Sequence, residues 1–359
     1  MKNIKIIIGI VIGVIILGII SIFIWYKSSL HEVKKENAET KIIEIQEGTR
    51  TEGILELLKK ENLIKSKWAS AIYIKLNGVK GLQAGVYQIS QDMSTKDVLA
   101  KIESGDVYDE TIKITFKEGK NMRWIAETIS ENTSNTEEDV YELLKDKEYI
   151  NSLINKYWFL TDVITNENIY YPLEGYLYPD TYIFENKDVS VKTIFNIILN
   201  NTDTVLKKYQ TQISQSGRSV HQILTIASII ELEGNDTESR NGISSVIYNR
   251  LRHNMSLGSD VTTYYAMQVD MGERNLYSSE LKTANPYNTR GPNMNGKLPI
   301  GPIGNPSEES INSALNPAKA SYLYFVADSN GKIYFTSTYA EHQNLIKSLQ
   351  KQGLWYEYE

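Results

Sequence analysis

The sequence predicts an α+β protein that has a single transmembrane helix near its N-terminus and a mainly helical domain toward its C-terminus. Three observations lead to this prediction. Residues 6–26 are an uncharged apolar run, short alternating segments and amphipathic helical segments share residues 41–131, and longer helical segments dominate from residue 136 onward. A chain of 359 residues is long enough for two or three domains beside such an anchor.

The apolar run Ile6–Tyr26 contains no charged residue over 21 positions. At about 1.5 Å of rise per residue, a helix of this length crosses a hydrocarbon core about 30 Å thick. Two lysines precede the run, so the positive-inside rule places residues 1–5 in the cytoplasm and the later domains outside the cell membrane. The run is long for a cleaved signal peptide, and no A-x-A-like site follows it. We therefore expect an uncleaved single-pass anchor over residues 6–26, followed by a polar linker over residues 27–40.

Residues 41–108 read as a small α+β module. Two strands are expected from alternating apolar residues, and three helices are expected from helical apolar spacing and capping signals. In chain order these elements are Lys41–Gln46, Thr51–Leu63, Lys67–Leu76, Gly85–Ser90 and Ser94–Glu103.

The pattern of strand, Glu-Gly and helix then recurs. Thr111–Phe116 alternates like a strand, Glu118–Gly119 follows it, and an amphipathic helix is expected from Asn121. Residues 41–131 therefore predict two related small units, which hold no convergent polar cluster and whose expected role is scaffolding or binding. Residues 109–215 are expected to combine the second unit with a helical and aromatic connection whose helices are Thr136–Tyr157 and Val189–Gln215.

An aromatic segment separates these two helices. Ile169–Phe184, IYYPLEGYLYPDTYIF, contains five Tyr and two Pro. One interpretation is a rigid loop that packs on the next domain. The other is a carbohydrate-binding surface, because flat aromatic rings offer an apolar face with a polar tip. Under the second interpretation Glu174 and Tyr178 are candidate substrate-binding residues, and the residues alone favour neither interpretation.

Residues 216–359 form the last predicted domain, and its organising element is a helix that is apolar nearly all round. The sequence VHQILTIASII at 220–230 predicts a buried helix, and this helix runs into Glu231, Leu232 and Glu233. A carboxylate on the last turn meets the negative end of the helix dipole and apolar neighbours, and both disfavour its charged form. A general acid near neutral pH needs this property. The alternative is that Glu231 is a solvated glutamate at a helix end without a catalytic role. Glu233 is a second candidate for the general acid.

The segments that follow the buried helix predict a second helix, a long loop and a hairpin. Gly234 is expected to close the buried helix, and Asp236 or Thr237 is expected to cap the next one. A long loop rich in Pro and Gly is expected to be a functional wall or a mobile segment. A hairpin is expected around Ser329–Gly331, because a turn signal separates two strand-like runs. The expected elements are a helix at Glu238–His253, a turn and short segment at Leu257–Ala266, the loop Asn285–Ser307, the strands Tyr322–Asp328 and Lys332–Thr338, and a helix at Tyr339–Gly353.

Composition argues against several classes of function. The chain has no cysteine, which excludes disulfides and thiolate metal sites. Its four histidines show no zinc-ligand spacing, so neither a metal nor another cofactor is expected. The formal net charge of -6 and the absence of a basic stripe give no reason to expect a nucleic-acid partner.

Several motifs, in their order and spacing, resemble the endolytic murein transglycosylase family, also called MltG or YceG-like. The resemblance runs from about residue 41 to the C-terminus, with the anchor in the expected place. The motifs are LEGYLYPDTY at Leu173–Tyr182, LTIASIIELEG at Leu224–Gly234, VIYNRL at Val246–Leu251, NPYNT at Asn285–Thr289, LPIGPIGNPS at Leu298–Ser307, LNPA at Leu315–Ala318 and YLYFVAD at Tyr322–Asp328.

The resemblance implies a membrane-anchored lytic transglycosylase. The family cleaves the MurNAc–GlcNAc β-1,4 bond inside peptidoglycan glycan strands and leaves a 1,6-anhydro-MurNAc end. It implies Glu231 as the catalytic residue and a LysM-like fold for residues 41–108. It also implies peptidoglycan synthases of the elongation machinery as partners, beside which growing strands are terminated.

A transglycosylase can work with one carboxylate, whereas a glycosidase ordinarily uses two. The C6 hydroxyl of the sugar attacks C1, so Glu231 first protonates the leaving oxygen and then takes the proton of that hydroxyl. Because cyclisation is intramolecular, little further entropy is lost. By motif position, the candidates that line the substrate groove are Glu233, Asn249, Asp260, Tyr264, Tyr287 and Asn288.

The chain departs from the family pattern at three places that leave Glu231 untouched. Val261 stands where the family has Pro, Arg290 follows the Tyr-Asn-Thr triplet in place of Tyr, and Ile300 replaces the second Pro of Leu-Pro-Pro-Gly. Two alternative functions remain open. One is a hydrolase in which Glu233 or Asp260 positions a water molecule, and the other is a membrane-tethered scaffold that binds glycan without cutting it.

Overall fold

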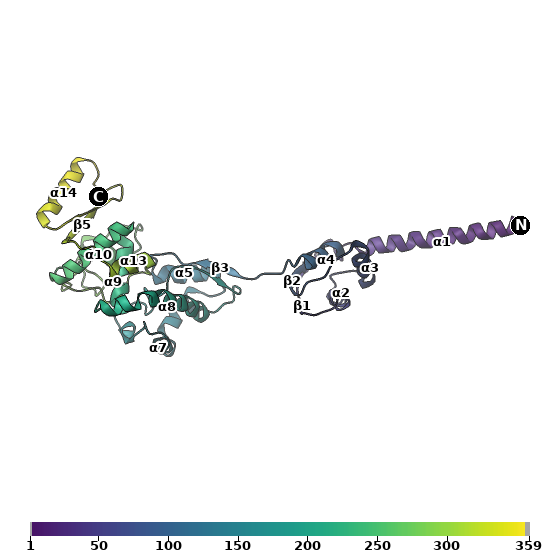
Figure 1. Ribbon diagram of the computed structural model, residues 1–359, viewed down its shortest axis with the longest axis horizontal. Coiled ribbons are helices and arrows are strands. Elements are labelled where there is room, and N and C mark those ends of the chain that lie inside the picture. The colour runs from purple at the N-terminus through teal and green to yellow at the C-terminus, as the bar shows by residue number, and fades with distance from the viewer. Residues whose placement is uncertain (1, 356–359) are drawn as a thin grey trace. The chain divides into compact units, whose positions relative to one another are not determined.

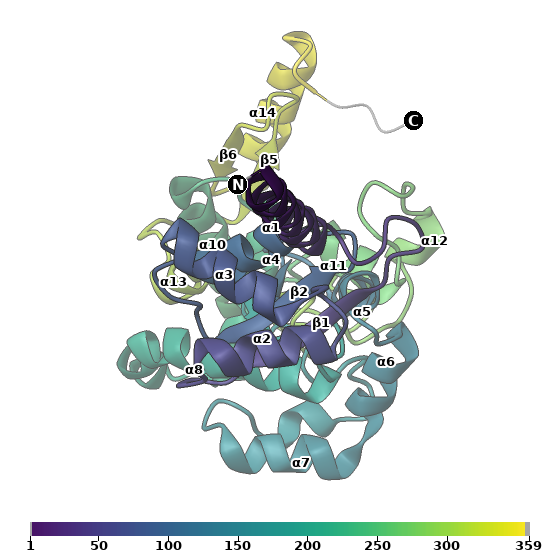
Figure 2. The ribbon, with the colours of Figure 1, turned by 90° about the vertical axis from the view of Figure 1, so that its right-hand side faces the viewer.

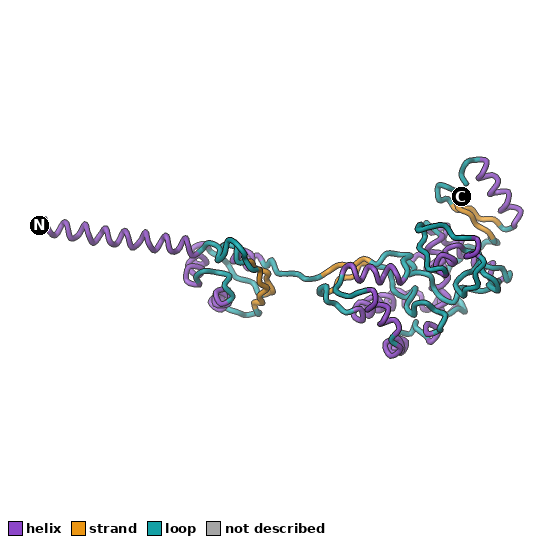
Figure 3. The backbone as a smooth tube through the Cα atoms, turned by 180° about the vertical axis from the view of Figure 1, so that it is seen from behind, coloured by secondary structure: helices purple, strands orange, loops and turns teal. Residues whose placement is uncertain are grey.

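The computed structural model describes residues 2–355, which belong to two compact units, Met1–Glu110 and Thr111–Glu359. Helices and loops make up most of the described chain. Its strands form three two-stranded antiparallel sheets, drawn in orange in Figure 3. The predicted mixture of helices and short strands is confirmed.

The first unit begins with a long apolar helix, α1 (Lys2–Ser29), labelled in Figure 1. The most apolar 18-residue window of its segment Ile6–Ser29 has a mean hydropathy of 3.2, and no residue of that window is buried inside the protein. Large side chains such as Ile22 and Leu17 are 66% and 65% exposed. A helix of this length and composition can cross a membrane, and its exposed apolar surface fits a hydrocarbon environment better than water.

The rest of the first unit is a two-stranded sheet with three helices. Strands β1 (Thr40–Ile45) and β2 (Gly85–Ser90) are antiparallel, with Ile45 opposite Gly85. Their alternation buries Ile43, Ile45 and Tyr87 against the apolar faces of the helices. Each predicted element is present with ends shifted by at most three residues, and the helices are α2 (Thr51–Lys60), α3 (Lys67–Asn77) and α4 (Thr95–Ser104).

The second unit opens with β3 (Ile112–Thr115) and α5 (Met122–Asn132). β3 pairs with β4 (Thr181–Phe184), which lies inside the aromatic segment, and Thr115 stands opposite Thr181. The resemblance to the first small unit therefore stops after α5, because β3 pairs with a strand from far along the chain and not with one that directly follows α5. Aromatic residues from both sides of this strand pair belong to one core, in which the rings of Phe116 and Tyr182 are 6.0 Å apart.

The single helix predicted over Thr136–Tyr157 is wrong. The chain forms α6 (Glu137–Lys145) and α7 (Lys147–Lys156), which meet at Asp146. The Asp146 carboxylate accepts hydrogen bonds from the N–H groups of Glu148 and Tyr149, at 2.9 and 3.1 Å. An aspartate that caps a new helix interrupts the preceding one, and apolar periodicity does not report this. A 3-10 turn, η1 (Asp162–Thr165), and the long α8 (Val191–Gln215) follow.

The centre of the second unit is α9 (Val220–Glu233), which packs against α10 (Thr237–Arg252), α11 (Asp260–Ala266) and α13 (Glu308–Leu315). The helix is buried on every side from Ile223 to Ile230, as its all-round apolar sequence predicts. Gly234 ends it, as expected, and has an extended backbone (φ -107°). Asp236 caps α10 by accepting from the N–H of Ser239 at 2.8 Å.

The C-terminal part of the second unit contains a short helix, α12 (Ser278–Leu281), and the long loop that leads to α13. β5 (Tyr324–Ala327) then pairs antiparallel with β6 (Ile333–Thr336), and α14 (Tyr339–Lys351) packs on both strands (Figure 2). Gly242 of α10 lets the ring of Phe335 approach the helix, because a Cβ at this glycine would overlap the ring.

We expect Ile226→Ala to lower the free energy of unfolding of the second unit by about 3 kcal/mol, since it removes buried methyl groups and leaves a cavity. Ile226 is 0% exposed at the middle of α9. Denaturant unfolding followed by circular dichroism measures the change. Ile183→Ala is the control, because Ile183 is 59% exposed on β4 and should cost less than about 1 kcal/mol. Equal effects of the two variants would contradict the central place of α9 in the core.

Candidate active site

Glu231 lies at the junction of three helix ends. It is on the last turn of α9, and its side chain is only 6% exposed. One carboxylate oxygen, Oε2, accepts from the backbone N–H of Ser307 at 2.9 Å and from the Ser307 hydroxyl. Ser307 is the N-cap of α13, so the positive end of that helix faces the carboxylate. The Glu231 carboxylate is therefore nearly buried and fixed by hydrogen bonds, and Glu231 is not a solvated residue at a helix end.

Arg240, from the first turns of α10, reaches the other oxygen of this carboxylate. Its Nη2 lies 3.4 Å from Glu231 Oε1, and its Nη1 pairs with Glu309 of α13. The Arg240 side chain is 12% exposed, so the pair is poorly screened by water. An arginine that links two carboxylates fixes their spacing and stabilises the charge that a general acid leaves behind.

A loop from the start of the second unit covers the same end of α9. The Gly119 N–H donates to Asn305 O at 2.8 Å, and the Asn305 N–H donates to Lys120 O at 3.0 Å. Gly119 has φ +71°, and a Cβ there would lie 3.5 Å from Glu231 Cγ. A Cβ on Gly304 would lie 2.7 Å from Gly119 O, too close for a side chain. Two glycines thus let this loop and the loop before α13 meet directly over Glu231.

This contact places a second carboxylate, Glu118, beside Glu231. Burial raises the pKa of Glu118, and the negative charge of Glu231 raises it further. In the sequence, Glu118–Gly119 belongs to an apparent repeat, so Glu118 is not among the predicted site residues. The available signal was a glycine directly after a glutamate at the end of a strand, a position where the backbone can approach another segment closely.

A cavity of about 180 Å³ adjoins Leu232, the residue after Glu231. Trp124, Tyr264 and Gly119 line it together with Leu232. The ammonium groups of Lys120 and Lys117 lie 5.7 and 6.0 Å from the Trp124 ring. Tyr264, one of the predicted groove residues, therefore lines a cavity next to the residue that follows Glu231.

Glu233 and Asp260 lie elsewhere. Two residues along a helix turn the side chain by about 200°, so Glu233 points away from Glu231. Its Oε1 accepts from the Ser259 hydroxyl at 2.6 Å, and burial raises the pKa of Glu233. Asp260 begins α11 and pairs with Arg290, the residue that departs from the family pattern.

Asn249, Tyr287 and Asn288 are buried and contact neighbouring segments. Asn249 is 4% exposed, and its Nδ2 donates to the carbonyls of Ala320 and Tyr322 at 2.9 and 2.8 Å. Asn288 accepts from the Thr263 hydroxyl at 2.7 Å, and its Nδ2 donates to three carbonyls of residues 280–283. The ring of Tyr287 packs between those of Tyr170 and Tyr265, at 4.9 and 4.8 Å. These contacts hold loops together.

The two candidates from the aromatic segment differ in their surroundings. Glu174 is 1% exposed and accepts from the Met122 N–H and the Tyr265 hydroxyl, both at 2.9 Å. Burial raises the pKa of Glu174 to about 7. Tyr178 is half-buried, and the charges of Glu308 and Glu118 add to the burial that raises its pKa. The structure thus places Tyr178 near the cluster around Glu231 and places Glu174 in the core behind it.

Metal-binding geometry is absent from the part of the chain that the structure describes, where no three His, Asp or Glu side chains converge as ligands. The carboxylate of Glu231 is instead paired with an arginine, a serine hydroxyl and one backbone N–H group. This arrangement suits proton transfer by a side chain.

The comparisons with known proteins agree with the resemblance noted in the sequence. The model of the YceG-like family matches residues 43–348. A Bacillus subtilis protein named endolytic murein transglycosylase is 37% identical over 321 residues, which cover 89% of this chain and 88% of that protein. A protein of the same name from Streptococcus pneumoniae serotype 2 is 31% identical over 84% of this chain, and the match spans 57% of that protein. A solved structure from Listeria monocytogenes, described as yceG-like, has a TM-score of 0.61 and 34% identity, with 86% of this chain and 100% of that chain covered.

The raised pKa of Glu174 predicts a pH-dependent stability. Its pKa is about 7 in the folded chain, against an ordinary value of 4.5. The stabilisation that this group contributes is therefore complete below pH 4.5 and is lost as the pH rises toward 7, by at most about 3 kcal/mol. Glu174→Gln imitates the protonated acid and removes this loss. We expect the wild-type chain to lose stability relative to this variant between pH 4.5 and 7, as measured by denaturant unfolding.

Glu138→Gln provides the control for this comparison. Glu138 lies on α6 with a side chain that is 68% exposed, so its variant should follow the wild-type pH profile. Parallel profiles of wild type and Glu174→Gln would mean that Glu174 does not titrate in this range.

Proposed function

The chain belongs to the YceG-like family, and on this premise we propose that it is a membrane-anchored lytic transglycosylase that cuts peptidoglycan glycan strands internally. The observation that carries the proposal is that the nearly buried carboxylate of Glu231 accepts a hydrogen bond from Ser307 and forms an ion pair with Arg240. The names of the relatives support the substrate class, because murein is peptidoglycan.

The proposed bond is the β-1,4 linkage from MurNAc to GlcNAc. Glu231 donates its proton to the glycosidic oxygen, and the bond between that oxygen and C1 of MurNAc breaks. The C6 hydroxyl of the same MurNAc attacks C1, and Glu231 takes the proton that this hydroxyl loses. The product end is 1,6-anhydro-MurNAc, no water is consumed, and Glu231 is protonated again for the next cycle.

The surroundings of Glu231 suit both halves of this reaction. After the first proton transfer the carboxylate is stabilised by Ser307 and Arg240, whose positions are already fixed by α13 and α10. Attack by C6 is intramolecular, which removes most of the entropy cost of bringing a nucleophile to C1. The faces of Trp124 and Tyr264, beside Leu232, provide apolar surface for a sugar ring next to the cut.

The proposal also includes the cellular setting. α1 anchors the chain in the cell membrane as a single span, with residues 1–5 in the cytoplasm and the later domains outside, where peptidoglycan lies. Residues 41–108 serve as a LysM-like glycan-binding module. Peptidoglycan synthases of the elongation machinery are the proposed protein partners, so that cutting terminates strand growth, and this part rests on the family resemblance alone.

A hydrolase is the second candidate, and one contact favours it. The negative charge of Glu231 raises the pKa of Glu118, which gives the site two interacting carboxylates. In a hydrolase the second carboxylate would activate a water molecule or attack C1 itself. The neighbouring candidates Glu233 and Asp260 are less suited, because they contact Ser259 and Arg290.

We expect Glu231→Gln to lower the rate of glycan cleavage by at least about 100-fold, since glutamine keeps the shape but cannot transfer the proton. The full chain in detergent micelles is incubated with uncrosslinked glycan strands, and mass spectrometry identifies the new ends. Wild type should release fragments with 1,6-anhydro ends. Glu138→Gln removes an exposed carboxylate on α6 and should keep wild-type activity. Equal cleavage by wild type and Glu231→Gln would exclude Glu231 as the acid.

Glu118→Gln separates the two candidate reactions. For a transglycosylase we expect cleavage to continue within about tenfold of wild type with anhydro ends, because the C6 hydroxyl is the nucleophile. The same mass spectra provide the measurement. Reducing ends in wild type, together with a loss in Glu118→Gln as large as that in Glu231→Gln, would establish a two-carboxylate hydrolase instead.

A further inference from the structure

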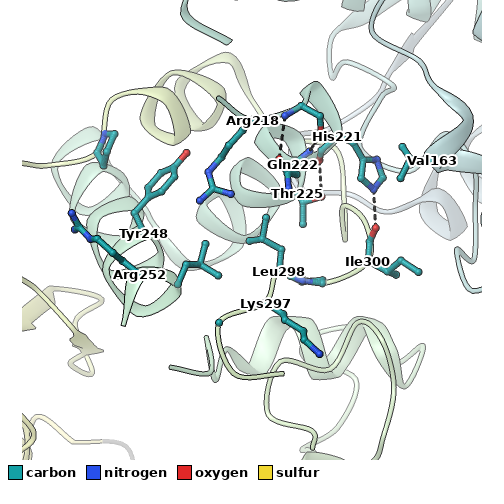
Figure 4. A pocket seen from close by; sticks show the side chains of 15 residues that line it. Val163, Arg218, His221, Gln222, Thr225, Tyr248, Arg252, Lys297, Leu298 and Ile300 are labelled. Atoms are coloured by element: carbon teal, nitrogen blue, oxygen red, sulfur yellow. Dashed lines mark hydrogen bonds between the residues drawn. The ribbon is translucent and has the colours of Figure 1, made fainter. Parts of the chain in front are cut away.

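A large cavity lies at the opposite end of α9 from Glu231. It has a volume of about 1130 Å³ and is bordered by the start of α9, the end of α10 and the loop Gly296–Ile300 (Figure 4). His221, on the first turn of α9, is ten residues before Glu231, which corresponds to about 15 Å along the helix axis. None of the reaction steps proposed above uses this cavity.

Three cations line this cavity, Arg218, Arg252 and Lys297, and no Asp or Glu is among its lining residues. Within residues 2–355, none of the three forms an ion pair with a carboxylate, although the whole chain carries a net charge of -6. Cations without a counter-charge attract anionic groups to a hollow surface. The cavity is therefore suited to a ligand that brings its own negative charges.

The two arginines are held in place while keeping donors for a ligand. The Arg218 guanidinium stacks on the Tyr248 ring at 4.9 Å, and Figure 4 shows it between Tyr248 and Leu298. Arg252 donates from Nη2 to Asn249 Oδ1. A guanidinium has five N–H donors in a planar arrangement, so each arginine can still donate two hydrogen bonds to one carboxylate.

The cations are separated by apolar surface. Leu251, Leu298 and Ile300 lie among them, and the His221 Nε2 hydrogen bond to Ile300 O, at 2.8 Å, holds this wall in position. A second cavity of about 500 Å³ shares Tyr248, Arg252 and Pro317 with the first, adds Lys319, and also contains no Asp or Glu among its lining residues. Together they form an extended cleft whose lining combines four cations with apolar side chains.

We propose that this cationic cleft, defined by Arg218, Arg252, Lys297 and Lys319, binds the carboxylate-bearing stem peptides of the glycan strand that Glu231 cuts. The inference rests on the proposed function, because it takes the ligand from the same polymer. A short peptide combines carboxylates with small apolar side chains, which matches a lining made of cations and apolar side chains. A phosphate polymer would instead call for cations that converge on each phosphate group.

The test measures binding without cleavage. The full chain with Glu231→Gln, in detergent micelles, is titrated calorimetrically with uncrosslinked glycan strands that carry stem peptides, and with the same strands after an amidase has removed the peptides. The double substitution Arg218→Ala and Lys297→Ala is then added, and Lys282→Ala is the matched control because Lys282 is exposed and lies outside both cavities. Circular dichroism confirms that each variant folds.

We expect the double variant to bind peptide-bearing strands at least about tenfold more weakly, the loss that follows from removing a charge-assisted hydrogen bond. Its affinity for stripped strands should not change, and Lys282→Ala should match the parent for both. Equal affinity of the parent for both kinds of strand, or equal weakening for both in the double variant, would overturn the inference. Complete displacement of peptide-bearing strands by millimolar inorganic phosphate would also overturn it, in favour of a phosphate ligand.

The outcome is separable from that of the proposed function. Binding that depends on both the peptides and the cleft residues supports the inference even if the chain with intact Glu231 fails to cut glycan. Cleavage with anhydro ends but no dependence of binding on stem peptides leaves the proposed function standing and rejects the cationic cleft as a peptide site.

Discussion

The structure of the second unit depends on how it accommodates one nearly buried carboxylate. A charge removed from water is costly unless hydrogen bonds and opposite charge replace its hydration. Glu231 receives both from Ser307 and Arg240, and therefore α9, α10 and α13 must meet at this point. The close contact of Gly119 with Gly304 follows from the same requirement, since the covering loops have no room for a side chain where they cross.

Much of this core follows from local patterns. The all-round apolar sequence of α9 predicts its burial, and Asp236 caps the next helix as expected. The partners of Glu231 could not be predicted in this way, because Ser307 lies 76 residues away and no local pattern encodes the contact. The pairing of β3 with β4 could not be predicted for the same reason. The break between α6 and α7 at Asp146 shows that a single capping side chain can end a helix even where the apolar periodicity continues.

Motif position alone did not separate residues that face a substrate from residues that hold loops. Asn249 and Asn288 belong to family motifs, yet their amide groups satisfy buried backbone carbonyls. An amide serves both purposes, so its residue type is uninformative until burial is known. Glu118 is the opposite case, because its position in an apparent repeat concealed a carboxylate that the fold brings to Glu231.

The hydrogen bonds that cover Glu231 join distant parts of the chain. Asn305 Nδ2 donates to Lys120 O across 185 residues, and Ser307 reaches back to Glu231 from the segment directly before α13. During synthesis, the loop that carries Glu118 and the helix that carries Glu231 both emerge before the segment that unites them. A nascent or truncated chain that ends before Ser307 therefore has no assembled site. Under the proposed function, cleavage of glycan strands would therefore begin only after most of the polypeptide has been made.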